Sequence, residues 1–170
     1  MNYHNITVDD MLNGDGLRVV LWTAGCSHRC EGCHNPVTWD EKGGLAFDQE
    51  ARAEITEALA KPYISGLTFS GGDPLYPDHI GEVTELAKEC KEQFPDKTIW
   101  LYTGYLWEEV CDLLVMDYVD VLVDGPFVKA LFDPKLHWKG SANQRVIDVK
   151  KSKETGNVII KEGEDYEYID

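Results

Sequence analysis

Short apolar runs alternate with longer amphipathic stretches along the chain, which is the pattern of strands followed by helices. The first apolar run, RVVLWT at 18–23, has glycine-containing turns on both sides and predicts a buried strand. Further runs of this kind, most of them closed by glycine or aspartate, predict strands over 66–70, 97–102, 120–123, 145–149 and 157–161. We therefore expect a chain of core strands that each lead into a loop.

Helical periodicity fills the gaps between these strands. Asp48 is a typical N-cap residue, and a helix is predicted from there to about residue 61, where Pro62 ends it. A second helix is predicted over 77–94, because apolar residues recur there at intervals of three and four. A third, short helix is predicted after residue 105, with its inward face formed by Leu106, Val110, Leu113 and Leu114.

The strand, loop, helix order repeats at least three times and predicts an α/β fold with a mainly parallel sheet, since parallel strands need crossover connections. A complete eight-fold barrel takes about 250 residues. With 170 residues the chain is too short for one. We therefore expect a partial open (βα) barrel, with a doubly wound open sheet as the alternative. In either case the loops after the strands meet at one edge of the sheet.

Composition narrows the class of protein. The chain has 31 acidic and 16 basic residues and a formal net charge of −15, which disfavours binding to a nucleic-acid backbone. No leader-like N-terminus and no apolar run of membrane-spanning length is seen. We expect a cytoplasmic protein with one domain over 1–170, no membrane partner, and an acidic tail at 162–170.

Three of the five cysteines, Cys26, Cys30 and Cys33, lie together in a C-x3-C-x2-C loop directly after the first predicted strand. Three thiolates can hold three irons of a [4Fe-4S] cluster and leave the fourth iron open. A structural zinc site of the Cys3His type, completed by His28 or His34, is the alternative. Cys90 and Cys111 lie on apolar helix faces and are expected to be core residues.

A second unusual loop, Gly71-Gly72-Asp73-Pro74, follows the predicted strand at 66–70. Glycines allow close approach of the backbone to a ligand, and Asp73 adds an acceptor beside them. This combination suits a ligand ammonium better than a phosphate, because the lysine of a phosphate-binding loop is missing. Thr103 begins a third loop at the same expected edge of the sheet.

The two loops in this order resemble those of the radical S-adenosylmethionine enzymes. Within that family, the chain most resembles the activating proteins of anaerobic ribonucleoside-triphosphate reductases. This chain differs from the wider family at Gly32, where an aromatic residue is usual. The resemblance to the activating proteins weakens after about Arg145. The matching segments are 1–4, 13–16, 25–35, 70–75, 100–105, 121–127 and 139–144.

The resemblance implies a [4Fe-4S] cluster with three cysteine ligands, Cys26, Cys30 and Cys33, and one open iron that binds the amine and carboxylate of S-adenosyl-L-methionine. It implies that the Gly-Gly-acid loop binds the amine of that cofactor. The expected cofactor-binding residues are Gly32, Cys33, His34, Gly71, Gly72, Asp73 and Thr103.

In function, the resemblance implies reductive cleavage of S-adenosylmethionine to a 5'-deoxyadenosyl radical, which makes a glycyl radical on the large subunit of an anaerobic ribonucleoside-triphosphate reductase. The electron comes from a donor such as flavodoxin or ferredoxin. No catalytic side chain is predicted, because the cofactor supplies the chemistry. The alternatives are a small-molecule radical enzyme of deazapurine synthesis and a non-catalytic zinc or electron-transfer module. The short chain favours a macromolecular substrate, since little of it is left to enclose a small one.

Overall fold

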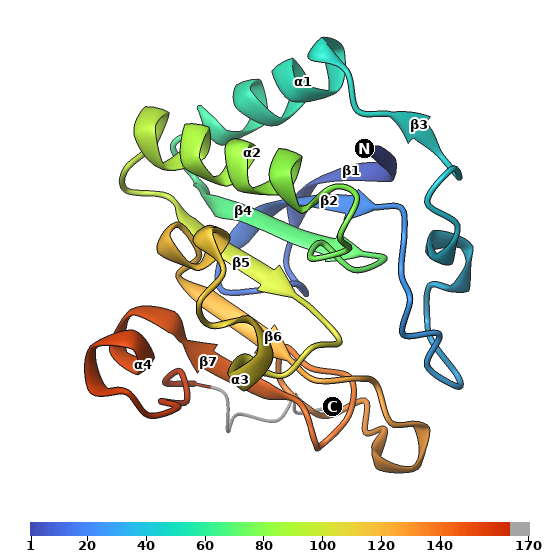
Figure 1. Cartoon of the computed structure of the whole chain (residues 1–170). Coiled ribbons are helices and arrows are strands. Elements are labelled where there is room, and N and C mark those ends of the chain that lie inside the picture. Colours follow the sequence, from blue (N-terminus) through green and yellow to red (C-terminus); the bar gives the residue numbers. More distant parts are fainter. Residues whose placement is uncertain (164–170) are drawn as a thin grey trace.

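The computed structural model describes residues 1–163, and within them seven strands form one mixed sheet in the order β3-β1-β2-β4-β5-β6-β7. Figure 1 shows this sheet crossing the molecule from β3 to β7. The strands are β1 (Asn2–Asp10), β2 (Leu17–Thr23), β3 (Leu45–Ala46), β4 (Ile64–Gly71), β5 (Thr98–Tyr102), β6 (Val121–Asp124) and β7 (Arg145–Asp148).

The three helices predicted from the amphipathic pattern are present, and a short fourth helix after the last strand was not predicted. The helices are α1 (Gln49–Leu59), α2 (Ile80–Gln93), α3 (Trp107–Val110) and α4 (Val149–Thr155), with 3-10 turns η1 (Pro36–Trp39), η2 (Leu114–Asp117) and η3 (Lys129–Leu131). The predicted N-cap of α1 is confirmed, since the Asp48 carboxylate accepts hydrogen bonds from the amides of Glu50 and Ala51 at 3.1 and 3.0 Å. Within the described residues, no helix is long and apolar enough to cross a membrane.

The predicted partial open (βα) barrel is wrong, because the sheet is open and mixed. Strands β2, β4, β5 and β6 are parallel neighbours, but β1 pairs antiparallel with β2 and β3, and β7 pairs antiparallel with β6. A barrel requires strand and helix units that continue to add parallel strands. Here residues 125–144 return the chain from β6 to β7 without an α-helical crossover, and antiparallel strands end both edges.

The sheet is not doubly wound either, because its α-helices share one face. Ile55 of α1, Val83 of α2, Val110 of α3 and Val149 of α4 all belong to one core cluster. The strand residues of that cluster include Leu21, Phe69, Leu101 and Leu122. Since side chains alternate along a strand, the neighbouring residues point to the opposite face.

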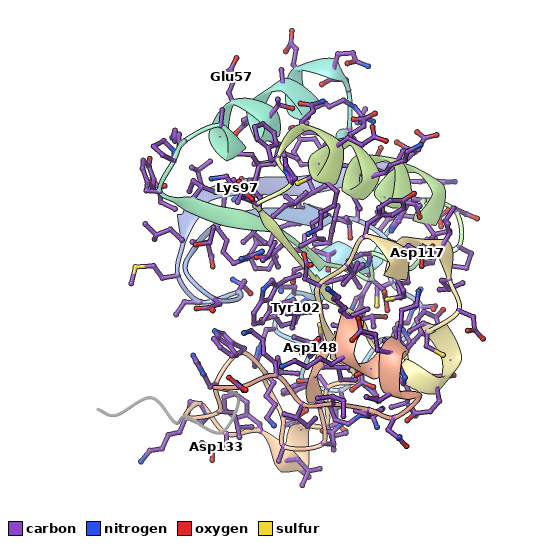
Figure 2. The ribbon with its side chains drawn as sticks, turned by 90° about the vertical axis from the view of Figure 1, so that its left-hand side faces the viewer. Glu57, Lys97, Tyr102, Asp117, Asp133 and Asp148 are labelled. Atoms are coloured by element: carbon purple, nitrogen blue, oxygen red, sulfur yellow. The ribbon has the colours of Figure 1, made fainter. Side chains whose placement is uncertain are left out.

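That opposite face is divided into a small core and a cavity. The core consists of Trp100, Val121, Val123, Trp138 and Val146. Nearer the carboxyl ends of the strands, Trp22, Ser70 and Tyr102 line the cavity. In both figures α1 and α2 lie at the top and the 125–144 segment lies at the bottom. Figure 2 labels two residues that line the cavity, Tyr102 of β5 and Asp133 of the 125–144 segment.

Several smaller expectations also need correction. Residues 157–161 do not form a strand and make a single bridge, Ile147 to Ile160. Leu106 and Leu114 are 43% and 63% exposed, so the prediction that they face inward is wrong. Val110 is buried as predicted, Leu113 packs against the core, and Trp107 is buried with them. Strands β1 and β3 were not predicted. Residues 164–170 of the expected acidic tail lie outside the described residues.

Arg18 of β2 is fully buried on the face of the sheet opposite the helices. Its Nε donates to Thr68 Oγ1 at 2.8 Å, and its Nη2 donates to the carbonyls of Leu67 and Thr98 at 2.9 and 2.7 Å. Its Nη1 donates to Asp15 O and Thr98 Oγ1, both at 3.0 Å. Burial lowers the pKa of Arg18 to about 10. Neutral oxygens on two strands, β4 and β5, and on the turn at Asp15 therefore depend on one guanidinium.

Replacing Arg18 with Met should lower the free energy of unfolding by roughly 2–4 kcal/mol, because it leaves several buried acceptors without a donor. Urea unfolding of the metal-free chain measures this change. Lys88→Met is the matched control, since the Lys88 side chain is 55% exposed on α2; it should stay within about 0.5 kcal/mol of the parent. Equal stability of the two variants would contradict the role given to Arg18.

Candidate functional site

A cavity of about 510 Å³ lies at the carboxyl ends of the parallel strands. The loops after β2, β4 and β5 and the segment after β6 all reach it, as expected for parallel neighbours in a sheet. Of the predicted site residues, the structure places all but Gly32 on its wall. Those that line it are Cys26, Cys30, Cys33, His34, Gly71, Gly72, Asp73 and Thr103.

The cysteine loop is held in place by backbone hydrogen bonds to η1. The amide of Gly25 donates to Thr38 O at 2.8 Å, and the amide of Cys26 donates to Trp39 O at 3.2 Å. The loop turns sharply at Gly32, which has φ of 74°. The thiols of Cys26, Cys30 and Cys33 are all partly exposed. One continuous loop therefore presents three thiols to the cavity.

The other two cysteines lie elsewhere. Cys90 is 4% exposed in the core between α2 and the sheet, where burial raises the pKa of its thiol to about 11. Cys111 follows α3 and packs against the same core. Burial also raises the pKa of Cys26, but a bound metal deprotonates a coordinating thiol outright. Cys26, Cys30 and Cys33 are thus the thiols that can act as ligands in the cavity.

The residues around these thiols fit an anionic iron-sulfur cluster. The amide of Asn35 donates to Cys33 Sγ at 3.4 Å, a contact that favours a thiolate. The indole Nε1 of Trp39 is buried and has no hydrogen-bond partner within the described chain, although the side chain lines the cavity. An unpaired buried donor costs about 1–3 kcal/mol. A cluster sulfur would supply such a donor with an acceptor.

The two histidines considered for a zinc site have other partners. His28 Nε2 lies 2.7 Å from Asp73 Oδ2. The His34 ring lies between the rings of Phe127 and Phe132, with centroids 4.9 and 5.4 Å away. Among residues 1–163, no three His, Cys, Asp or Glu side chains are grouped closely enough to hold a single metal ion.

The Gly71–Asp73 loop packs directly on the cysteine loop. The amide of Asp73 donates to Gly25 O at 2.8 Å. A Cβ atom at Gly72 would lie 2.5 Å from that same carbonyl oxygen and 2.9 Å from Thr38 O. Gly71 has φ of 99°, which glycine adopts readily. Contact with the cysteine loop therefore accounts for Gly72, and the positive φ and close contact with Thr23 of β2 account for Gly71, in addition to the expected approach of a ligand.

Asp73 is 2% exposed, and its carboxylate accepts hydrogen bonds from all sides. Thr103 Oγ1 donates at 2.9 Å, and the amides of Leu75 and Gly104 donate at 2.9 and 3.0 Å. His28 Nε2 is the fourth partner. The sequence predicted Asp73 and Thr103 as cofactor contacts; the structure brings both to the cavity and also joins them to each other.

The sequence suggested His28 only as a possible fourth ligand of a zinc site, and its contact with Asp73 was not predicted. Its ring packs edge-on against Tyr105, with centroids 4.5 Å apart. The hydrogen bond that His28 donates to the Asp73 carboxylate raises the pKa of His28. No local spacing signals this pair, because the two residues are 45 positions apart.

The segment 125–144 forms the last wall of the cavity. Phe127 and Phe132 contact His34, and Lys129 forms an ion pair with Glu31 at 3.3 Å. Within the segment, Gln144 Oε1 accepts a hydrogen bond from the amide of Gly140 at 2.9 Å. It therefore packs over the cysteine loop, a contact that the strand pattern did not predict.

Asp124 ends β6 at this same edge of the sheet. The structure buries it completely, and Arg145 Nη2 donates to its carboxylate at 2.5 Å. The amide of Trp107 donates to the same carboxylate at 2.8 Å. Asp124 therefore stabilises the base of α3 and β7 and does not face the cavity.

Similarity to known proteins covers most of this chain. A family model described as a 4Fe-4S single cluster domain matches residues 12–147. The chain is 47% identical over 146 residues to the anaerobic ribonucleoside-triphosphate reductase-activating protein of Enterobacteria phage T4, covering 86% of this chain and 93% of that protein. Proteins of the same name from Vibrio cholerae and Escherichia coli (strain K12) are 43% and 40% identical, covering 85–86% of this chain and 96–97% of theirs.

Replacing Gly72 with Ala should lower the free energy of unfolding by roughly 1–3 kcal/mol, because the added methyl group overlaps two carbonyl oxygens. Gly81→Ala is the matched control, since a Cβ there has no neighbour within 4 Å. It should leave stability unchanged or raise it by about 0.5 kcal/mol, as Ala favours a helix. Urea unfolding tests both, and a Gly72→Ala chain as stable as its parent would contradict the packing of the two loops.

Proposed function

Since the chain belongs to the family of anaerobic ribonucleoside-triphosphate reductase-activating proteins, we propose that it is the radical S-adenosylmethionine enzyme that makes the glycyl radical of such a reductase. One observation carries the proposal. The three thiols of the C-x3-C-x2-C loop and the Gly-Gly-Asp loop line the same cavity. A cluster and a cofactor bound to these loops would be in contact.

In this proposal Cys26, Cys30 and Cys33 hold a [4Fe-4S] cluster, and its open iron binds S-adenosylmethionine. When bound, the cluster supplies the single electron that cleaves the cofactor, and the resulting organic radical takes a hydrogen atom from a glycine of the partner. The protein itself binds, orients and shields these groups. No side chain is required as a general base.

The residues of the cavity suit these tasks. The backbone of the Gly71–Asp73 loop and of Gly32, Cys33 and His34 is assigned to cofactor binding, and Thr103 supports it through Asp73. The Phe127 and Phe132 rings contact His34 and so support the cysteine loop from the side of the 125–144 segment.

The partner is proposed to be the large subunit of the anaerobic reductase. Leu12 and Phe132 line the cavity and are 68% and 47% exposed, so its wall reaches solvent at these residues. A loop of the partner can enter there and exclude water from the site. The electron donor is proposed to be a flavodoxin or ferredoxin, and the compartment the cytoplasm.

The direct test is electron paramagnetic resonance of the reconstituted chain mixed anaerobically with the reductase, S-adenosylmethionine and reductant. A glycyl-radical signal should appear on the reductase, and a reductase with its acceptor glycine changed to Ala should bind and give no signal. Conversion of a free small molecule at a comparable rate would instead favour the enzyme of deazapurine synthesis. Zinc in place of iron would favour the non-catalytic module.

Cysteine variants provide the matched controls for this test. Cys26→Ala, Cys30→Ala and Cys33→Ala should each lose bound iron and the glycyl-radical signal, whereas Cys90→Ala and Cys111→Ala should keep both. Cys90→Ala should lower stability by only about 1 kcal/mol, because the side chain is small. Iron retained after loss of any one of the three loop cysteines would overturn the ligand assignment.

A further inference from the structure

We propose that His28 is a positioning residue, which fixes the distance between the cysteine loop and the Gly71–Asp73 loop through its hydrogen bond to the Asp73 carboxylate. The part of this inference that concerns S-adenosylmethionine rests on the proposed function. His28 lies between Cys26 and Cys30, so its position and theirs are set by the same few backbone torsions. Whatever holds the His28 ring also holds these two thiols.

Contacts on three sides hold that ring. His28 Nε2 is 2.7 Å from Asp73 Oδ2, and Asp73 itself is 2% exposed and tied to its own loop by the amide of Leu75. Tyr105 packs against one side of the ring. Gly104 lies against another, where a Cβ atom would be 2.5 Å from the ring. The His28 side chain is therefore seated on the loops that follow β4 and β5.

The Asp73 carboxylate has little capacity left for a ligand. A carboxylate has about four acceptor positions. Thr103 Oγ1, the amides of Leu75 and Gly104, and His28 Nε2 provide four donors to it. A ligand ammonium would thus meet backbone carbonyls of this loop, while the carboxylate acts on the ligand indirectly, by holding the loops together.

Two readouts on the iron-loaded chain test this role. The first is the rate at which a chelator removes iron, and the second is the affinity for S-adenosylmethionine by anaerobic calorimetry. His28→Ala should speed iron loss by about tenfold and weaken binding by about tenfold, the effect of losing one hydrogen bond to a charged group. His28→Gln presents an amide donor toward Asp73 and should recover most of both losses.

The decisive comparison repeats His28→Ala in an Asp73→Asn background. If His28 acts through Asp73, the effect of His28→Ala on both readouts should fall to less than about twofold in the Asp73→Asn background. The reason is that the hydrogen bond between residues 28 and 73 is already altered in that background. An equal effect in both backgrounds, or failure of His28→Gln to restore either readout, would overturn the proposal. A parent chain that holds iron but binds no S-adenosylmethionine would refute the proposed function, and the iron-loss measurements would still decide the role of His28.

Discussion

The buried carboxylate of Asp73 is the constraint on which the site depends. A buried charge is stable only when it is well hydrogen-bonded, and here its donors come from three loops that are far apart in the sequence. His28 belongs to the cysteine loop, and Thr103 and Gly104 belong to the loop after β5. Satisfying one carboxylate thus sets the relative positions of the groups that are proposed to hold the cluster and the cofactor.

The sheet makes this arrangement possible. Strands β2, β4 and β5 are adjacent and parallel, so their carboxyl ends deliver three loops to one place. Because the α-helices share the opposite face, the sheet can expose Trp22, Ser70 and Tyr102 to a cavity. The antiparallel strands at both edges stop the sheet from closing into a barrel, and the segment 125–144 supplies the remaining wall.

Local signals predicted much of this architecture. The apolar runs followed by glycines located the core strands and the edge at which their loops meet, Asp48 marked the start of α1, and the spacing of Cys26, Cys30 and Cys33 indicated a cluster. Strand β1 was missed because Ile6 is its one buried residue among half-exposed and exposed neighbours. The barrel was expected because short apolar runs carry no information about strand direction.

Long-range contacts could not be predicted in this way. Nothing near His28 in the sequence indicates that its partner is 45 residues away, and Asp73 beside two glycines resembles a free acceptor until its donors are seen. The glycine at 72 was explained by a ligand, whereas the structure also requires it for packing against Gly25. In each case the decisive neighbour lies on another loop.

Amide hydrogen exchange tests the central role of Asp73 most directly. The amides of Leu75 and Gly104 donate to its carboxylate and should exchange slowly in the parent chain. In Asp73→Ala both should exchange much faster, while core amides of β4 such as that of Leu67 should keep their protection. Unchanged exchange at Leu75 and Gly104 in this variant would contradict the account, because the loops would then be held together without the carboxylate.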